Sequence, residues 1–168
     1  ELRLAYEKVE DLRYGENPHP QAAFYRKVAL QPTGLAAAKQ LQGKQLSYNN
    51  YLDLEAVLGF VRECKEPAAI IVKHNSPCGV ATADTLVQAY NDALACDPVS
   101  AFGGIIGLNR TLDVATAEAI TQGIEKYGFM ECILAPSYDP KAVEMFAAKK
   151  NLRLLEMPAL ADEEALGY

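Results

Sequence analysis

Short apolar runs alternate with longer segments of helical periodicity over most of the chain from Ala68 onward. The runs are rich in Ile, Leu and Val, as buried strands usually are, and they cover residues 68–72, 103–108, 132–135 and 152–155. Apolar residues recur every three or four positions in the segments before and between these runs, at residues 52–65, 82–95, 113–127 and 140–150. This alternation predicts an α/β fold, in which a mostly parallel sheet is covered by helices on both faces.

Capping residues mark the starts of three predicted helices. Asp84 and Asp113 stand at the starts of two periodic segments, and Asp139-Pro140 is typical of a cap followed by a first helical position. The first 45 or so residues show no period, because prolines and glycines interrupt them. We therefore predict an extended arm over residues 1–47 and an α/β core over residues 48–168, without internal repeats or an interdomain linker.

The net charge of the chain limits which kinds of molecule it can bind. The chain has 168 residues and a formal charge of -6, which fits one globular domain with no general attraction to nucleic acid or anionic lipid. Any bound anion must then be held by a local cluster. No apolar stretch approaches the ~20 residues of a membrane span, and the N-terminus lacks a signal-peptide core. The sequence opens on Glu1 rather than Met, so we expect residues upstream.

Cysteine usage argues against a metal site. The four cysteines form no C-x-x-C pair and have no regular spacing; they are Cys64, Cys78, Cys96 and Cys132. Neither a zinc site nor a disulfide framework follows from this pattern. We expect a cytoplasmic protein without bound metal.

The first candidate site is the segment Lys73–Gly79, which follows the strand predicted at residues 68–72. Ligands of parallel sheets bind at the carboxyl ends of strands. An imidazole such as that of His74 can accept a proton near neutral pH, and the ammonium of Lys73 can stabilise an oxyanion. Asn75 adds a hydrogen-bonding side chain. In the alternative interpretation, Lys73 is only solvated and His74 only supports a turn.

A second candidate lies in the arm, where Arg13 and Tyr14 precede a glycine. The planar guanidinium matches phosphate oxygens, and the phenol adds a donor, so the pair suits a phosphate clamp. The alternative is a surface turn in which Arg13 forms an ion pair with Glu16.

Two further segments have both structural and ligand-binding interpretations. In residues 97–104, Gly103 and Gly104 allow close backbone packing at a strand entry, or let a ligand ring lie against the main chain with Phe102 stacked on it. The segment does not match the G-x-G-x-x-G fingerprint, so a dinucleotide site is unsupported. Residues 42–53 are explained by a glycine turn and an Asn or Ser helix cap.

Together these segments resemble the aminoimidazole carboxamide ribonucleotide (AICAR) transformylase part of the bifunctional purine biosynthesis enzymes. The matching stretches are LRYGENPH at 12–19, QGKQLSYNN at 42–50, VKHNSPCGVA at 72–81 and DPVSAFGGIIGLNR at 97–110. Pro20 and Ser76 depart from the family, which commonly has Gln and Asn there. Four long matches in the family's order make chance agreement untenable and weaken the structural alternatives.

The resemblance implies a phosphoribosylaminoimidazolecarboxamide formyltransferase. Its reaction passes a formyl group from 10-formyltetrahydrofolate to the 5-amino group of AICAR, in IMP biosynthesis. His74 then matches the family's proton acceptor and Lys73 its transition-state stabiliser. Arg13 and Tyr14 match the nucleotide-binding pair, while Phe102 and Gly103 match a segment beside the AICAR base. Glu131 falls where some members have an Asp that contacts the nucleotide.

The resemblance also implies a fold and an assembly. It predicts a cytidine deaminase-like, three-layer α/β/α arrangement, but the zinc of deaminases is not expected, because Pro77-Cys78 lacks the second cysteine. The chain corresponds to the first transformylase subdomain. The family's IMP cyclohydrolase domain and second transformylase subdomain are missing, so we expect an inactive fragment of a homodimeric enzyme with its site at the interface. A nucleotide-binding module without turnover, or a purely structural fragment, are the rival interpretations.

Overall fold

The computed structural model describes residues 2–28, 32 and 34–161 as a six-stranded sheet with helices on both faces and a separate two-stranded hairpin. The strands are β1 (Tyr6–Asp11), β2 (Ala23–Lys27), β3 (Lys39–Gln42), β4 (Ala68–Lys73), β5 (Ser76–Thr82), β6 (Ile105–Leu108), β7 (Cys132–Ala135) and β8 (Arg153–Glu156). The α-helices are α1 (Tyr48–Val61), α2 (Leu86–Cys96), α3 (Val114–Tyr127) and α4 (Pro140–Phe146), and 3-10 turns occupy Gly34–Ala37 and Pro158–Ala161.

The sheet is mixed, with strand order β3-β8-β7-β6-β4-β5. Strands β6, β7 and β8 are parallel, as the alternating pattern predicted, whereas β3, β4 and β5 pair antiparallel with their neighbours. The α/β class is therefore confirmed, and the parallel part is confined to three strands. Strand β5 was not predicted: residues expected to form a loop turn straight back along β4, because a two-residue turn joins them and needs no crossover helix.

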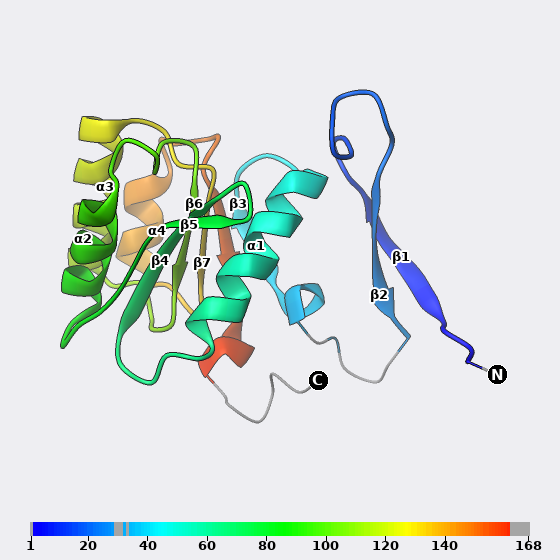
Figure 1. The fold of residues 1–168 in the computed structure, drawn as a ribbon, viewed down its shortest axis with the longest axis horizontal. Coiled ribbons are helices and arrows are strands. Elements are labelled where there is room, and N and C mark those ends of the chain that lie inside the picture. Colours follow the sequence, from blue (N-terminus) through cyan, green and yellow to red (C-terminus); the bar gives the residue numbers. More distant parts are fainter. Residues whose placement is uncertain (1, 29–31, 33, 162–168) are drawn as a thin grey trace.

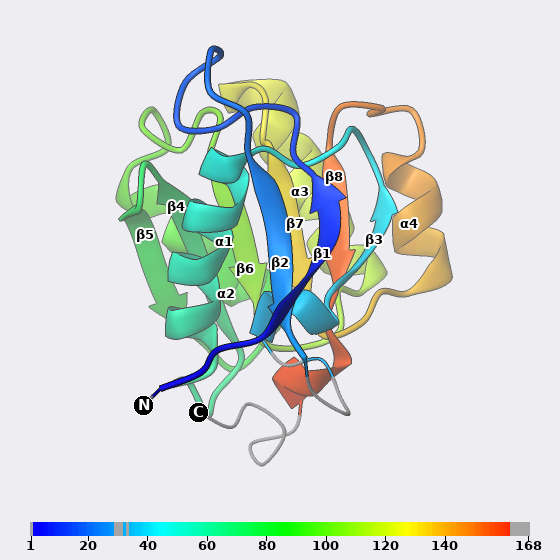
Figure 2. The same ribbon diagram turned by 90° about the vertical axis from the view of Figure 1, so that its right-hand side faces the viewer.

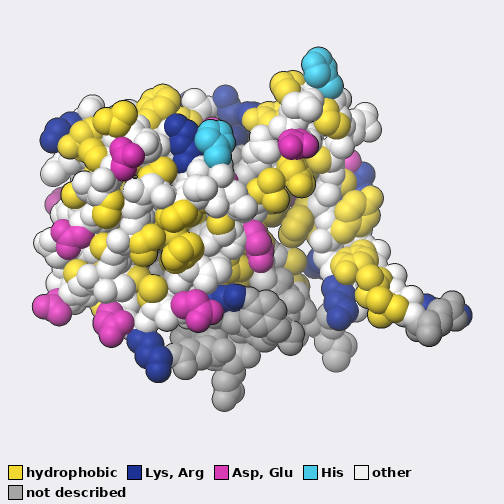
Figure 3. All heavy atoms as spheres, viewed as in Figure 1, with side chains coloured by type: hydrophobic (Ala, Val, Ile, Leu, Met, Phe, Trp, Pro, Cys, Tyr) yellow, Lys and Arg dark blue, Asp and Glu magenta, His cyan; other side chains and the backbone are white. Residues whose placement is uncertain are grey.

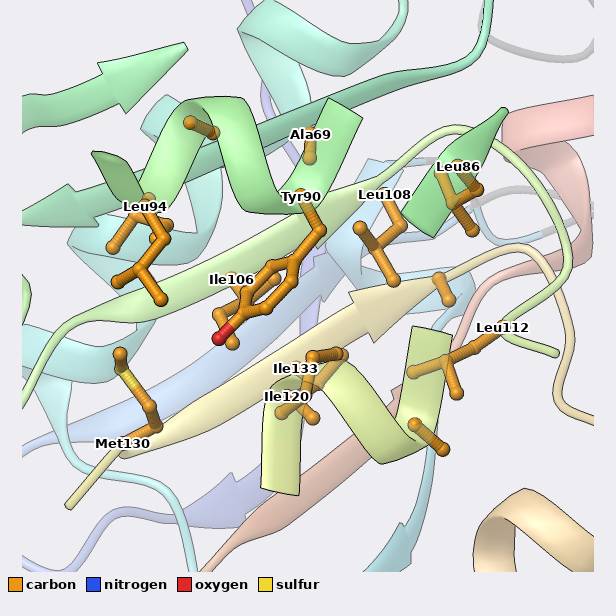
Figure 4. Packing of buried hydrophobic residues seen from close by; sticks show 14 of the residues in the cluster. Ala69, Leu86, Tyr90, Leu94, Ile106, Leu108, Leu112, Ile120, Met130 and Ile133 are labelled. Atoms are coloured by element: carbon orange, nitrogen blue, oxygen red, sulfur yellow. The ribbon is translucent and has the colours of Figure 1, made fainter. Parts of the chain in front are cut away.

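Two apolar cores lie on opposite faces of the sheet, which gives the three layers seen in Figure 1. On one face, Leu54, Val57 and Val61 of α1 pack against the sheet. On the other face, α2, α3 and α4 cover the sheet, and Tyr90 lies among Ile106, Ile120 and Ile133 (Figure 4). Figure 1 shows α1 between the sheet and the β1–β2 hairpin.

The β1–β2 hairpin contacts the core through Tyr51 of α1. The Tyr51 ring stacks on Phe24 of β2 at 4.3 Å between centroids, and its hydroxyl donates to Glu10 of β1 at 2.9 Å. Figure 2 shows the hairpin lying across the α1 side of the molecule. The arm predicted over residues 1–47 is thus a hairpin followed by β3, and β3 joins the edge of the main sheet.

Helix caps follow local side-chain chemistry. Asp113 and Asp139 cap α3 and α4 as predicted, with Pro140 at the first turn. The cap of α2 is Thr85 rather than Asp84, because its hydroxyl accepts the Gln88 N–H. Helix α4 ends at Phe146, four residues before the predicted end at residue 150. Within the described ranges, no helix has the length and apolar character to cross a bilayer.

Candidate functional site

The turn between β4 and β5 presents the first predicted residues. Lys73 pairs with Ser76, so His74 and Asn75 form a two-residue hairpin loop. Their φ angles are 51° and 62°, as the twist of such a hairpin requires. Asn tolerates this left-handed backbone better than most residues, and His is also enriched there. The turn exposes His74 at the carboxyl end of β4.

Lys73 and His74 line one surface pocket of about 420 Å³, so the two residues share a cleft. The other lining residues come from β5 and from the end of α2; they are Ser76, Pro77, Cys78, Asp97 and Ser100. Hydrogen bonds from Ser100 hold the pKa of Asp97 below its ordinary value. Burial raises the pKa of the Cys78 thiol, which therefore stays protonated at neutral pH.

Phe102 lies beside Lys73, and Gly103 follows it in the chain. The Lys73 ammonium nitrogen is 5.9 Å from the centroid of the half-exposed Phe102 ring. Gly103 has a φ of 78° and donates its N–H to the Phe129 carbonyl at 2.6 Å. A side chain at Gly104 would come within 3.0 Å of the backbone of Val72 and Ala101. Gly103 is therefore suited to the positive φ of the turn, and Gly104 to close packing of the backbone.

Glu131 belongs to a polar network next to this segment. Its Oε2 accepts from Arg153 Nη1 at 2.9 Å and from Asn50 Nδ2 at 3.0 Å. The Arg153 side chain is only 3% exposed and also donates to the carbonyls of Lys44 and Gln45. One-third of the Glu131 side chain remains exposed, so it is partly available to a ligand.

Arg13 and Tyr14 form the pair predicted in the arm. Arg13 Nη2 donates to the Tyr14 hydroxyl at 2.9 Å, and the guanidinium carbon lies 4.7 Å from the Tyr14 ring centroid. Arg13 therefore contacts Tyr14, not the Glu16 of the alternative interpretation. The backbone of this loop is fixed to the start of α1, because Arg13 N–H donates to Leu46 O and Tyr48 N–H to Tyr14 O.

Helix α1 connects these groups at one edge of the sheet. Its first turns contact the arm through Tyr48, the Glu131 network through Asn50, and the β4–β5 turn through Asp53. Because β4 runs antiparallel to β6, the carboxyl end of β4 meets the amino ends of β6 and β7. Figure 3 shows histidine and basic side chains along this upper edge. The 420 Å³ pocket itself is not lined by Arg13, Tyr14, Phe102, Gly103 or Glu131.

A larger pocket of about 560 Å³ opens at the opposite edge, where β6, β7 and β8 end. It contains none of the predicted site residues, and several of its polar groups bond within the fold. Arg110 donates to the carbonyls of Asn109 and Lys65, while Thr111 pairs with Ser137 at 2.7 Å. We therefore place the candidate site at the edge bearing Lys73, where the predicted residues Lys73, His74 and Phe102 lie together.

Within the described part of the chain, no three His, Cys, Asp or Glu side chains gather as a metal-binding group. The four cysteines are free and lie in different segments of the fold, and Cys132 is buried in β7. Burial raises the pKa of the Cys132 thiol well above its ordinary value, which disfavours the thiolate that a metal needs.

Three polar residues of the site were not named as site residues from the sequence: Asn50, Asp53 and Arg153. Asn50 and Asp53 lie in the segment 42–53, for which a helix cap was the expected role. A signal for two of them was present. Asn50 and Asp53 are three positions apart, and they continue the apolar stripe of Leu54 and Val57 toward the start of α1. Polar residues in line with a buried helix face contact other groups of the fold more often than they contact solvent. Arg153 lies within an apolar run and offered no such signal.

Known proteins match nearly the whole chain. The AICARFT/IMPCHase bienzyme family model covers residues 1–167. The chain is 57% identical over 168 residues to the bifunctional purine biosynthesis protein PurH of Myxococcus xanthus, covering 98% of this chain and 32% of that protein. It is 50% identical to PurH of Halalkalibacterium halodurans, covering 98% of this chain and 31% of that protein. The chain thus spans about a third of the length of these relatives.

Proposed function

Because the chain belongs to the AICARFT/IMPCHase bienzyme family, we propose that it carries part of the site that transfers a formyl group to AICAR in purine biosynthesis. The donor in this proposal is 10-formyltetrahydrofolate, and no metal takes part. The observation that carries the proposal is that Lys73 and His74 line one pocket at the end of β4. An amine bound in that pocket would lie near both a proton acceptor, His74, and a cation, Lys73.

The reaction needs both groups, because the AICAR amine is a weak nucleophile whose lone pair is delocalised into the ring. The amine nitrogen attacks the formyl carbon, and its proton passes to the His74 imidazole. The formyl oxygen becomes an oxyanion, which the Lys73 ammonium stabilises. The bond from the formyl carbon to N10 of the folate then breaks, N10 takes up a proton, and the products are formyl-AICAR and tetrahydrofolate.

The remaining residues hold the nucleotide in this proposal. Arg13 and Tyr14 bind the phosphate, since their guanidinium and hydroxyl are adjacent and Arg13 is exposed. Phe102 and the backbone at Gly103 contact the AICAR base. Glu131 contacts the nucleotide through Oε1, because its Oε2 already accepts hydrogen bonds from Arg153 and Asn50.

We further propose that the site is completed by other parts of the protein and by a second copy. His74, Arg13 and Phe102 are all exposed in this chain, so a bound nucleotide would remain open to water. The arm also exposes a cluster of large apolar side chains, namely Leu2, Leu4, Tyr6, Val9, Tyr25 and Val28. So many large apolar side chains exposed on one short segment favour an interaction surface there.

Two measurements test the function. Calorimetric titration of the 168-residue chain with AICAR should show binding, and the complete protein should form tetrahydrofolate from 10-formyltetrahydrofolate only when AICAR is present. Binding without formyl transfer by the complete protein would favour the nucleotide-binding module. Cyclisation of formyl-AICAR to IMP by the 168-residue chain alone would assign it to the cyclohydrolase activity and contradict the proposal.

A further inference from the structure

The turn that carries His74 has a strained backbone. Both His74 and Asn75 have positive φ, and only glycine adopts that region without a steric cost. Strained residues of this kind persist only where the surrounding structure holds them. A two-residue turn at the tip of a hairpin has few neighbours that could hold its backbone, and the side chains of His74 and Asn75 are both exposed.

Asp53 supplies one such contact. Its Oδ1 accepts the backbone N–H of Asn75 at 2.6 Å, which is a short, charge-assisted hydrogen bond. The bond joins residues 22 positions apart, so it ties the turn to helix α1. Helix α1 is anchored beside the turn at this point, because Leu54, the neighbour of Asp53, is fully buried in the core that also contains Val72 of β4.

We propose that Asp53 is a positioning residue, whose carboxylate holds the left-handed backbone at Asn75 and thereby directs the His74 imidazole into the pocket beside Lys73. This inference rests on the proposed formyl transfer. Asp53 does not line the pocket, so it acts through the turn and not on the substrate. The hydrogen bond requires only an acceptor oxygen at position 53, so a carboxamide there should preserve much of the effect.

The first test is structural and does not depend on catalysis. Amide hydrogen exchange of Asn75 is measured by NMR in the 168-residue chain, and Asp53→Ala should speed it about tenfold or more, because the closed turn opens more often. Glu55→Ala is the matched control, since Glu55 is an exposed acid on the same helix. An unchanged exchange rate at Asn75 in Asp53→Ala, with the chain still folded, overturns the inference.

The second test uses the complete enzyme. Asp53→Ala should lower kcat about 10–100-fold, as expected for a misplaced catalytic group, while the KM for AICAR stays within about twofold. Asp53→Asn should recover most of the turnover. In an Asn75→Gly background, where positive φ carries no steric cost, Asp53→Ala should lower kcat by only about threefold relative to Asn75→Gly alone.

The outcomes separate two kinds of failure. If Asp53→Asn loses as much turnover as Asp53→Ala, or if the loss is the same in the Asn75→Gly background, Asp53 does not act by holding the turn. If Asp53→Ala speeds amide exchange while His74→Ala leaves formyl transfer intact, the turn is positioned as inferred, and the proposed role of His74 is wrong.

Discussion

The ammonium of Lys73 faces the ring of Phe102 at 5.9 Å from its centroid, which brings the end of β4 and the entry to β6 together at one edge. One side of the ring is closed by Gly128, where an added Cβ would lie 2.7 Å from Phe102 Cδ2. About half of Phe102 remains exposed. The exposed part of the ring is available to stack on a planar ligand.

We expect Phe102→Ala to weaken AICAR binding by about 1–3 kcal/mol, the usual loss when a base loses an aromatic partner. Phe102→Tyr keeps the ring and should bind within about threefold of the original protein. Calorimetric titration measures both. Equal affinities for the Ala and Tyr variants would show that the ring does not contact the base.

The roles of His74 and Arg13 should separate in steady-state kinetics of the complete enzyme. His74→Ala removes the proton acceptor and should lower kcat about 10²–10⁴-fold, with little change in AICAR affinity. Arg13→Ala should chiefly weaken AICAR binding, because a phosphate contact acts alike in the ground state and the transition state. Near-normal kcat in His74→Ala together with unchanged affinity in Arg13→Ala would contradict both assignments.

Sequence periodicity was sufficient for the elements that bury one apolar face. The run Cys132–Ala135 and the helix from Asp113 to Tyr127 have the predicted bounds. Periodicity did not predict β5, because its segment Ser76–Gly79 contains Pro77 and Gly79, two residue types that disfavour strands. The fold accepts Pro77 because β5 is an edge strand. Gly79 is required there because any side chain would collide with Ala93 O of α2.

The site was predictable only in part, for a physical reason. Lys73, His74 and Asn75 are contiguous, so one hairpin places them and local sequence identifies them. The contact of Asn50 with Glu131 joins residues 81 positions apart, and that of Arg153 with Lys44 joins residues 109 apart. Such pairings depend on strand order, which hydrophobic periodicity does not specify.

Glu131→Ala should destabilise the fold, because it leaves the buried guanidinium of Arg153 without its carboxylate. We expect a loss of about 2 kcal/mol in the free energy of unfolding, below the ~3–5 kcal/mol of a fully buried pair because Glu131 is partly exposed. Glu131→Gln keeps an acceptor for Arg153 and Asn50 and should lose less. Urea denaturation measures the difference, and midpoints of both variants equal to that of the unsubstituted protein would show that the charge and its hydrogen bonds contribute nothing.

Two glycine substitutions should act in opposite directions. A Cβ at Gly79 would lie 1.9 Å from Ala93 O, so Gly79→Ala must displace α2. We expect it to destabilise by about 1–3 kcal/mol or more. Gly59 lies within α1 with no atom within 4 Å of an added Cβ, so Gly59→Ala should stabilise by about 0.5–1 kcal/mol. Thermal denaturation compares them, and a neutral Gly79→Ala would mean that α2 packs less closely on β5.

Alkaline pH should destabilise the fold through Tyr138. Its hydroxyl donates to Ile133 O and Leu155 O at 2.9 and 3.0 Å, and burial raises its pKa well above 10.0. The folded state therefore favours the protonated phenol. The stabilisation that the raised pKa of Tyr138 gives the folded state is complete below pH 10 and is lost as the pH rises toward the pKa of the folded state. The free energy of unfolding should thus fall above pH 10, less steeply in Tyr138→Phe.

Tyr90 provides the comparison for Tyr138. It is also buried, but its hydroxyl has no hydrogen-bond partner among the described residues. At pH 7, Tyr138→Phe should destabilise by about 1 kcal/mol, whereas Tyr90→Phe should be neutral or stabilising, because it removes an unsatisfied polar group. Equal losses in the two variants would imply that the Tyr90 hydroxyl is satisfied in solution.

The two-residue connection between β4 and β5 has a consequence for the order in which the site forms. Hairpins with such short loops form within about 1–10 μs, whereas contacts between distant segments wait for slower chain closure. The turn that presents Lys73 and His74 at one edge therefore forms as soon as β4 and β5 pair. The bonds from Arg153 to Lys44 and from Asn50 to Glu131 close only after β7 and β8 have joined the sheet. In a newly synthesised chain, the turn that carries His74 should therefore form before Glu131 gains its partners Asn50 and Arg153.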